Sequence, residues 1–183
     1  MLVKIMFALI AVFAMVSCDG ETYKTVKIGS QIWMAENLKV ETKDSWCYDN
    51  NESKCEEYGR LYTWSAAMKA CPSGWHLPSS SEFETLFETV GGQWEAGKML
   101  KSKTGWRDRH GSDRNGTDAY SFSALPAGYR LNNGNFAHEG KIARFWTSSG
   151  SSLMCLGCYS SDRAALMGLD EEYSGLSVRC VKD

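Results

Sequence analysis

Seven cysteines, spread from position 18 to position 180, constrain this 183-residue chain more than any other feature. An odd number cannot pair completely within one chain. Setting Cys18 aside leaves six, namely Cys47, Cys55, Cys71, Cys155, Cys158 and Cys180. Six cysteines can form three bridges in many alternative connectivities. Disulfides persist mainly outside the reducing cytosol, so the cysteines cannot be interpreted without asking whether the chain is exported.

The first 17 residues have the features of a secretory signal. Lys4 supplies a positive charge, residues 5–16 form an unbroken apolar run, and Ser17 is a small residue directly before Cys18. The run is shorter than the about 20 apolar residues that span a bilayer. Cys18 is either a plain residue after ordinary cleavage near Ser17, or an acylated N-terminus, because residues 15–18 (MVSC) resemble the lipobox of bacterial lipoproteins.

Cysteine parity favours the lipoprotein interpretation, because acylation of Cys18 leaves an even number of cysteines. We therefore expect a signal peptide over residues 1–17, a lipidated Cys18 with a polar tether over residues 18–24, and one domain over residues 25–183. The protein is then exported and lipid-anchored in the bacterial cell envelope, at the outer membrane or cell surface, with the membrane as one partner.

Composition agrees with one compact domain and excludes one class of partner. The chain is long enough for a single substantial core and short for two domains. Lys and Arg number 20 against 22 Asp and Glu, for a net charge of −2, so we expect no nucleic-acid partner. Abundant Gly (17) and aromatic residues with few Pro (3) indicate a turn-rich, folded chain.

Two or three short helices are predicted in the N-terminal half. Apolar residues follow helical spacing over residues 59–70 and again over residues 83–90. The second run comes after Ser79 and Glu82, which are spaced as a capping box. Residues 96–102 predict a weaker helix, because Gly97 interrupts it.

Strands are predicted at the start and in the C-terminal half. Alternating apolar residues around a Gly-Ser turn predict a β-hairpin over residues 25–33. Further strands are expected over residues 121–130, 143–149 and 176–181, with polar turns such as residues 132–135 between them. The fold class is therefore α+β with a mainly antiparallel, loop-rich sheet late in the chain. Residues 44–55 form a polar loop that a Cys47–Cys55 bridge fits well.

Several motifs in this order resemble the Fibrobacter succinogenes major paralogous domain (FISUMP), a family of secreted bacterial lipoprotein domains. The resemblance covers residues 22–183 and is carried by TVKIG (25–29), WMAENL (33–38), GRLYTW (59–64), CPSGWHLP (71–78), NGTD (115–118), FSALPAGYR (122–130) and SVRCV (177–181). More remotely, the plan is similar to the C-type lectin fold and to the domain of formylglycine-generating enzymes. This likeness implies a disulfide-stapled, C-type lectin-like domain in which Cys71, near a helix end, pairs with Cys180 in the last strand.

Aromatic side chains in or beside polar loops are the candidate ligand platform, because flat rings stack on the apolar faces of sugars. The alternative is that they belong to the core, as we expect for Trp33, Trp64, Trp75 and Trp146, which lie in family motifs. Asp118 adds a carboxylate that either contacts a ligand or closes an Asx turn. The candidate ligand-binding residues are Trp46, Tyr48, Trp106, Asp118 and Tyr129, and Trp94 is a further aromatic residue in or beside a polar loop.

No metal site, cofactor or catalytic residue is predicted. The Glu-Pro-Asn, Gln-Pro-Asp and Trp-Asn-Asp triplets that hold calcium in sugar-binding lectin-like domains are missing, and the acidic run at residues 170–172 reads as a solvated loop. His76, His110 and His138 are too far apart for ligand spacing. No nucleophile elbow, phosphate loop or paired-carboxylate motif occurs.

The CxxC at Cys155 and Cys158 leaves a choice open. It forms a small structural bridge, which we favour, or a redox or metal-binding pair. The resemblance to formylglycine-generating enzymes implies the second, since those enzymes carry two copper-binding cysteines upstream of the same closing strand. We therefore expect a non-enzymatic binding or adhesion module for glycans or another surface protein. The alternative is a copper-binding or oxidase-like protein that uses Cys155 and Cys158.

Overall fold

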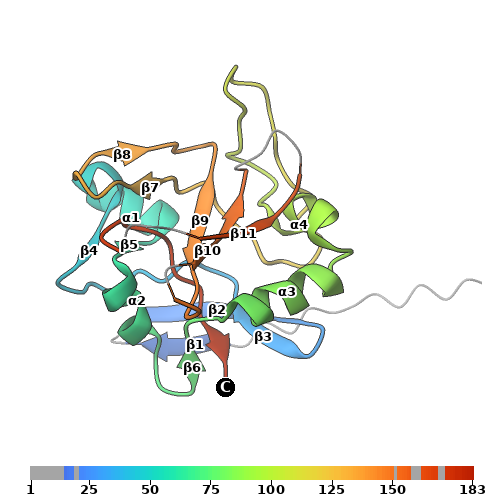
Figure 1. The fold of residues 1–183 in the computed structure, drawn as a ribbon, viewed down its shortest axis with the longest axis horizontal. Coiled ribbons are helices and arrows are strands. Elements are labelled where there is room, and N and C mark those ends of the chain that lie inside the picture. The colour runs from blue at the N-terminus through green and yellow to red at the C-terminus, as the bar shows by residue number, and fades with distance from the viewer. Residues whose placement is uncertain (1–14, 19–20, 151, 158–161, 169–171) are drawn as a thin grey trace, which may run out of the picture.

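The computed structural model describes residues 15–18, 21–150, 152–157, 162–168 and 172–183. They form an α+β fold, as the sequence predicts. In Figure 1 the largest sheet lies at the bottom of the view, a three-stranded sheet stands above it, and four short helices lie to either side. The expectations for residues 1–14, for Cys158 and for the acidic residues Asp170 and Glu171 fall outside the described ranges.

The largest sheet joins the first and last strands of the chain. Its five strands are ordered β1-β2-β3-β12-β6, and every neighbouring pair is antiparallel. The strands are β1 (Met15–Cys18), β2 (Glu21–Ile28), β3 (Gln31–Met34), β12 (Val181–Lys182) and β6 (Trp75–His76). The predicted hairpin is confirmed, because Ile28 pairs with Gln31 and Gly29 takes a φ of 60° in the turn.

Folded structure begins before the expected domain boundary at Thr25. Residues 21–24 belong to β2, and Tyr23 is only 1% exposed, with its hydroxyl oxygen accepting a hydrogen bond from the Lys39 amide at 3.1 Å. The segment expected as a tether thus places a side chain in the core. Cys18 lies in β1 opposite Glu21, and its lipidation stays a prediction.

The position of the sheet differs from the expectation. We expected it in the C-terminal half, but the largest sheet is built mainly from N-terminal strands. The last strand enters between two of them, since Val181 pairs with Trp33 on one side and with His76 on the other. A short final strand gains two partners in this way, whereas at an edge it would have one.

Two disulfides have the predicted pairing. Cys47 and Cys55 are bonded with their Cα atoms 4.9 Å apart, and Cys71 and Cys180 with theirs 5.9 Å apart. The second closes a loop of 109 residues beside β12 and β6. Cys155 is also disulfide-bonded.

The described residues before position 101 form four α-helices, where two or three were expected. They are α1 (Glu52–Tyr58), α2 (Trp64–Ala70), α3 (Ser80–Thr89) and α4 (Gln93–Leu100). The capping box before α3 is confirmed, with Ser79 accepting from the Glu82 amide and the Glu82 carboxylate accepting from the Ser79 amide. None of the helices in the described ranges is long and apolar enough to cross a membrane.

Helix α1 was missed and α2 is shorter than expected. The polar loop after Cys47 contains the short 3-10 helix η1 (Tyr48–Asn50), and then Asn51 caps α1 by accepting a hydrogen bond from the Ser53 amide. Helix α2 begins after Thr63, which accepts from the Ala66 amide. The residues before it form strand β5 (Leu61–Tyr62), which pairs with β4 (Ser45–Trp46).

The later strands depart most from the prediction. They are β7 (Tyr129–Arg130), β8 (Phe136–Ala137), β9 (Ala143–Trp146), β10 (Ser152–Leu156) and β11 (Ala165–Gly168). The turn expected at residues 132–135 joins β7 to β8, and β9 confirms part of the strand expected at 143–149. Residues 121–128 are not a strand, because Ser121 and Ser123 have positive φ values. Strands β10 and β11, which complete the three-stranded sheet, were not predicted.

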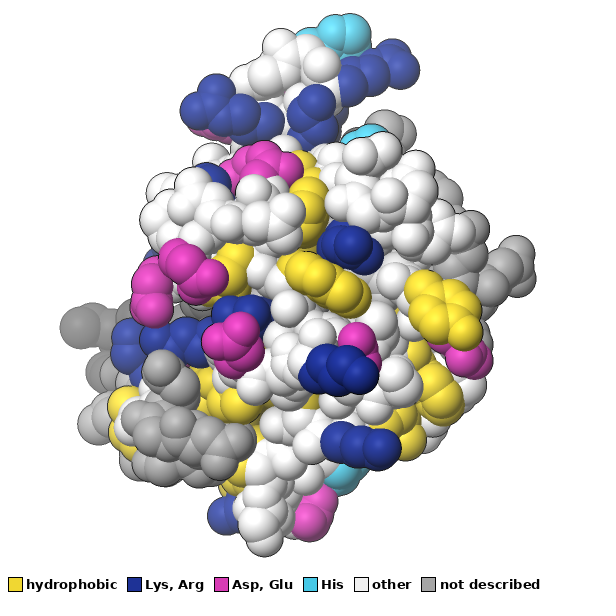
Figure 2. All heavy atoms as spheres, turned by 90° about the vertical axis from the view of Figure 1, so that its left-hand side faces the viewer, with side chains coloured by type: hydrophobic (Ala, Val, Ile, Leu, Met, Phe, Trp, Pro, Cys, Tyr) yellow, Lys and Arg dark blue, Asp and Glu magenta, His cyan; other side chains and the backbone are white. Residues whose placement is uncertain are grey.

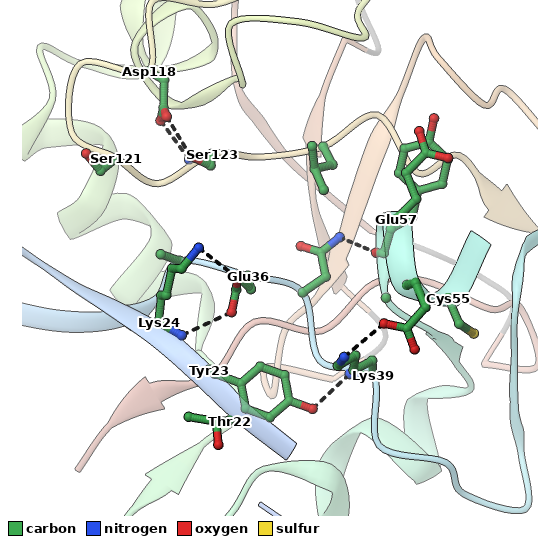
Figure 3. A pocket seen from close by; sticks show the side chains of 16 residues that line it. Thr22, Tyr23, Lys24, Glu36, Lys39, Cys55, Glu57, Asp118, Ser121 and Ser123 are labelled. Carbon is green, nitrogen blue, oxygen red and sulfur yellow. Dashed lines mark hydrogen bonds and ion pairs between the residues drawn. The ribbon is translucent and has the colours of Figure 1, made fainter. Parts of the chain in front are cut away.

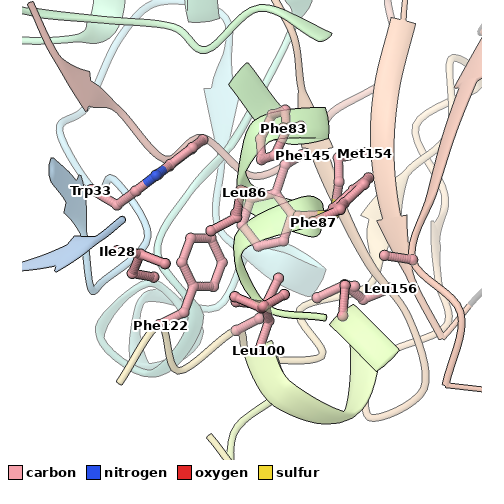
Figure 4. Close-up of a cluster of buried hydrophobic side chains, with 14 of the residues drawn as sticks. Ile28, Trp33, Phe83, Leu86, Phe87, Leu100, Phe122, Phe145, Met154 and Leu156 are labelled. Atoms are coloured by element: carbon pink, nitrogen blue, oxygen red, sulfur yellow. The ribbon is translucent and has the colours of Figure 1, made fainter. Parts of the chain in front are cut away.

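The core lies between the two sheets and helices α3 and α4. Figure 4 shows Trp33 from β3, Phe83 from α3, and Phe122 and Phe145 from the later half packed together. The Trp33 ring centroid lies 5.1 Å from that of Phe83 and 5.8 Å from that of Phe122. A second cluster gathers around the Cys71–Cys180 disulfide and includes Trp146. Trp33 and Trp146 are fully buried, as expected of core tryptophans, whereas Trp64 and Trp75 are only partly buried.

Candidate functional site

One cleft in the described part of the chain has the size and the polar lining of a ligand site. Its volume is ≈ 520 Å³, within the range of small-molecule pockets. It lies between β2, the segment after β3, helix α1 and the loop at residues 118–125 (Figure 3). We call it the polar cleft. Four separate segments meet there, which is typical of a binding site assembled by the fold.

Charged side chains of both signs line the polar cleft. The Glu36 carboxylate accepts a hydrogen bond from the Lys24 amide at 3.0 Å and lies 3.6 Å from the Lys24 ammonium. The Lys39 ammonium contacts Glu56 at 3.1 Å. Surface ion pairs of this kind contribute about 1 kcal/mol or less, so a ligand can displace them at little cost.

The loop at residues 118–123 faces the cleft in an unusual backbone conformation. Asp118, Ser121 and Ser123 have φ values of 47°, 56° and 51°, a region that non-glycine residues rarely adopt. The Asp118 carboxylate accepts hydrogen bonds from the Ser123 amide at 2.7 Å and from the Ser123 hydroxyl at 2.5 Å (Figure 3). Such conformations cost about 1–3 kcal/mol each and persist only where surrounding contacts hold them.

Arg179 explains what holds this loop. It is fully buried behind the cleft, and its guanidinium donates to the carbonyl oxygens of Phe122 and Ser123. Consecutive carbonyls point to opposite sides of an extended chain, so both reach one guanidinium only if the residue between them turns. The positive φ of Ser123 supplies that turn.

The Arg179 charge is stabilised from the cleft side as well. Its Nε atom donates to the Asn37 side-chain oxygen at 2.9 Å, and no carboxylate within the described ranges contacts the guanidinium directly. Burial lowers the pKa of Arg179 to about 9, while the charges of Asp118 and Glu36 act in the opposite direction. These two carboxylates line the polar cleft, so their negative charge both stabilises the buried Arg179 cation and makes the cleft surface more negative.

Asn37 connects this cation to the helix on the other side of the cleft. Its amide nitrogen donates to the Tyr58 carbonyl at the end of α1 at 2.8 Å, while its oxygen accepts from Arg179. Asn37 is 5% exposed and cannot exchange these partners for water. The two walls of the cleft are therefore fixed relative to each other through Arg179 and Asn37.

Trp106 is buried and is therefore not part of the predicted ligand platform. Its ring is 1% exposed, and its indole nitrogen donates to the Ser102 hydroxyl at 3.0 Å and to the Ala124 carbonyl at 3.1 Å. The Lys101 ammonium lies 5.3 Å from the ring centroid. A buried ring with its polar atom satisfied belongs to the core, which was the alternative interpretation.

Tyr129 and Tyr48 are likewise not available for stacking. Tyr129 is 9% exposed, with the His138 ring stacked 5.5 Å away and the Arg144 guanidinium carbon 3.8 Å from its centroid. Tyr48 is 7% exposed, and its ring lies 5.2 Å from that of Phe136. The prediction that these rings stack on a ligand is therefore corrected, because protein groups already cover them.

Trp46 and Asp118 keep accessible surface but lie in different places. Trp46 is partly exposed in β4, with the Arg130 guanidinium carbon 4.0 Å from its ring centroid. Asp118 lines the polar cleft and also closes the loop to Ser123. Trp94 is 61% exposed on α4, under the Arg163 guanidinium. Of the five predicted ligand residues, the structure places only Asp118 in the cleft.

Sequence reasoning missed Glu36, Asn37 and Arg179. The signal was present, since all three are polar residues within apolar motifs: Glu36 and Asn37 in WMAENL, and Arg179 between Val178 and Cys180. A charged residue in a buried strand needs a specific partner. That argument alone would have marked Arg179 as the centre of a polar network.

No free-thiol metal site is found in the part of the chain that the structure describes. The one group of possible ligands there comprises Cys47, Glu52 and Cys55, whose ligand atoms lie within 4.8 Å of one another. Both sulfurs are joined in a disulfide, so neither is the thiolate that binds metal. Cys155 is also disulfide-bonded, and in this oxidation state it is not a thiolate ligand for copper.

The comparisons with known proteins assign a family. The model of the Fibrobacter succinogenes major domain matches residues 26–182, which is most of the chain. No curated protein and no solved structure matches. The family match includes Glu36, Asn37, Asp118 and Arg179, so the polar cleft and its buried cation lie almost wholly within the matched region.

Proposed function

The chain belongs to the Fibrobacter succinogenes major domain family, and we propose that it is an exported, lipid-anchored binding module that binds a glycan in its polar cleft. Membership of this family suggests a surface-associated protein. Five cysteines are disulfide-bonded, namely Cys47, Cys55, Cys71, Cys155 and Cys180. Disulfides persist mainly in oxidising compartments, so these bonds support export.

The observation that carries the proposal is the rigid set of polar groups in the cleft. The carboxylates of Glu36 and Asp118 accept hydrogen bonds, and the Lys39 ammonium donates them, over a volume of ≈ 520 Å³. Sugar hydroxyls both donate and accept, so a cleft that offers both kinds of group suits them. The Arg179 and Asn37 network holds the walls in place, which lowers the entropic cost of binding.

The same contacts support a role in ligand binding rather than in catalysis. Each of the two central carboxylates is engaged by the protein, Glu36 by the Lys24 amide and Asp118 by Ser123. Cys55, which also lines the cleft, is in a disulfide and cannot act as a nucleophile. The groups are arranged to hold a ligand in one orientation.

A glycan array probed with the full chain tests the proposal. We expect a defined set of glycans to bind, and Glu36→Gln to weaken that binding about tenfold, because a hydrogen bond to a charged acceptor is lost. Glu84→Gln, the same change on the exposed side of α3, is the matched control and should bind like the wild type. Failure of every glycan to bind, or equal binding by Glu36→Gln, would contradict a glycan site in the cleft. Crosslinking on cells would then test a surface protein as the partner.

Anchoring is tested separately. Mass spectrometry of the mature N-terminus should find an acylated Cys18, and Cys18→Ser should release the protein from the membrane fraction. A mature chain with unmodified Cys18, or one that begins elsewhere, would leave the domain without the proposed anchor. Binding by the polar cleft does not depend on this result.

A further inference from the structure

A second surface, on the side of the molecule where β4 and the β7–β8 hairpin lie, carries arginines on aromatic rings. Figure 1 shows β4, β7 and β8 at the left-hand side, and Figure 2 looks directly at that side. Hydrophobic side chains there alternate with Lys and Arg side chains over an uneven surface (Figure 2). We call the part formed by Trp46, Arg130 and Phe136 the arginine–aromatic face.

Arg130 is held in one orientation by its surroundings. Its guanidinium carbon lies 4.0 Å from the Trp46 ring centroid. Its Nη2 atom packs so close to Gly134 that a Cβ atom there would be only 3.3 Å away. Its backbone is fixed by reciprocal hydrogen bonds with Gly175 at 2.9 and 2.8 Å. A cation stacked on Trp gains about 0.5–1 kcal/mol at an exposed site, which restrains the side chain before any ligand arrives.

The donors of this guanidinium are unused. In the described chain Arg130 makes no side-chain hydrogen bond or ion pair, and Trp46 contacts only the face of its guanidinium. Arg60 shows the contrast, because its nitrogens donate to Glu41 at 3.1 Å and to the Ser45 hydroxyl at 3.0 Å. Arg130 therefore presents an oriented, unneutralised fork of N–H groups at the surface.

Arg144 repeats the arrangement at the Tyr129 ring of the same hairpin. Its guanidinium carbon lies 3.8 Å from the Tyr129 centroid, and its Nε atom is buried without a hydrogen-bond partner. Burial and the positive charges of Arg144 and Lys141 lower the pKa of His138, which disfavours protonation of that ring. Among the residues that the structure describes, no carboxylate forms an ion pair with Arg144. Arg144 belongs to β9, and Tyr129 and Arg130 are successive residues of β7 whose side chains point to opposite faces of the strand, so Arg130 alone supplies the free guanidinium on the arginine–aromatic face.

We propose that the arginine–aromatic face binds a carboxylate-bearing glycan, with the Arg130 guanidinium donating to the carboxylate. A guanidinium fork matches a carboxylate with two parallel hydrogen bonds. Arg130 covers one face of Trp46 and Phe136 packs against Tyr48, but both side chains stay partly exposed, and that remaining apolar surface can contact the sugar ring that carries the carboxylate. The proposal extends the proposed glycan-binding function to a second surface and to acidic sugars.

The test is the affinity of the full chain for oligogalacturonate, with neutral maltodextrin of equal length and dextran sulfate as the other two arms. We expect oligogalacturonate to bind at least about tenfold more tightly than maltodextrin and more tightly than dextran sulfate. Arg130→Gln should reduce oligogalacturonate affinity about tenfold. Arg130→Lys, which keeps the charge but loses the planar fork, should also lose most of it. Arg109→Gln removes the same charge from an exposed loop and should have little effect.

Four results would overturn the proposal. They are an equal loss of affinity in Arg109→Gln and Arg130→Gln, full affinity in Arg130→Lys, tighter binding of dextran sulfate, and no preference over maltodextrin. Thermal unfolding shows whether a variant has lost its fold. If one Arg130 variant has, the other Arg130 variant and the preference of the wild type for oligogalacturonate over maltodextrin decide whether the proposal holds. Glu36→Gln separates the two sites, because it should weaken the cleft ligand and leave oligogalacturonate binding unchanged.

Discussion

Arg179 is the residue on which the largest number of other observations depend. It is a fully buried cation whose hydrogen-bond partners are three neutral oxygens, from Asn37, Phe122 and Ser123. Its ring contacts are Phe122 and Phe145, with the guanidinium carbon 4.4 Å and 5.7 Å from their centroids. The strained loop at the polar cleft is thus a consequence of satisfying one guanidinium.

Replacing Arg179 by Met tests that dependence. Three buried oxygens lose their donor, and each unsatisfied group costs about 1–3 kcal/mol, so we expect the free energy of unfolding to fall by about 3 kcal/mol or more. Urea denaturation followed by circular dichroism measures it. Arg109→Met, at an exposed position, should change it by about 0.5 kcal/mol or less. A near-neutral Arg179→Met would show that the network is dispensable.

His76 is a second residue whose chemistry follows from its neighbours. Its Nδ1 lies 2.6 Å from the Asp183 carboxylate and its Nε2 lies 2.8 Å from that of Glu82. Burial opposes protonation, but the hydrogen bonds to the two carboxylates outweigh it and raise the pKa of His76. When it is protonated, the ring joins strand β6 to the N-terminus of α3 through these two carboxylates, so protonation of His76 stabilises the fold.

The sign of the resulting pH dependence is fixed by the raised pKa of His76. The stabilisation is fully present below the unfolded value of about 6.5 and is lost as pH rises through the higher folded pKa. Urea midpoints should therefore fall as pH increases above about 6.5, and His76→Gln should remove most of that fall. His110→Gln, on an exposed loop, should keep it. A rising midpoint in the wild type over this range would contradict the assignment.

Among the helices, strands and turns, the features that were predicted correctly are those that neighbouring residues determine. The Gly29 turn and the Ser79–Glu82 capping box were predicted because each depends on a few neighbouring residues. The strand expected over residues 121–128 failed for a non-local reason, since Arg179 draws the carbonyls of Phe122 and Ser123 inward. Alternation in the sequence carries no information about a cation 56 residues away.

Helix α4 shows the reverse case, in which a residue that weakens a helix is required by packing. Gly97 was expected to interrupt the helix, but a Cβ atom there would lie 2.2 Å from the carbonyl oxygen of Asp162. The Gly97 amide donates to the same oxygen at 2.9 Å. The close approach of α4 to residue 162 therefore needs a residue without a side chain.

Gly97→Ala should destabilise the protein although Ala is the better helix former. Helix propensity alone predicts a gain of about 1 kcal/mol. The overlap with Asp162 should exceed it and give a net loss of about 1–3 kcal/mol in the free energy of unfolding. Lys98→Ala, at the next and exposed position of α4, should stay within about 0.5 kcal/mol. A stabilised Gly97→Ala would show that the two segments can move apart.

For the whole molecule, the Cys71–Cys180 disulfide ties the middle of the chain to its last strand. In the chain-entropy account a loop of about 100 residues gains about 4.7 kcal/mol, and the same relation gives about 2.5 kcal/mol for a loop of about eight. Replacing Cys71 and Cys180 together by Ser should therefore cost about 2 kcal/mol more than replacing Cys47 and Cys55. Thermal and urea unfolding of the two double variants measure the difference, and equal losses would contradict this account.

The candidate site was less predictable than the fold. Asp118 was identified because it lies in a polar motif, but Glu36 and Asn37 reach the cleft only when β3, α1 and the 118–125 loop are brought together. Trp106 was misassigned because its flanking residues are polar, although the ring itself points into the core. Sequence neighbours report the character of a loop, whereas burial depends on contacts with distant segments.

The central claim is that the polar cleft is a glycan-binding site, and NMR titration with a glycan selected on the array tests it most directly. Backbone amide shifts should move for Glu36 and Asn37 and across residues 118–123, and stay unchanged along α3. Glu36→Gln should weaken the titration about tenfold. Shifts confined to other surfaces, or the absence of any saturable shift, would contradict the account.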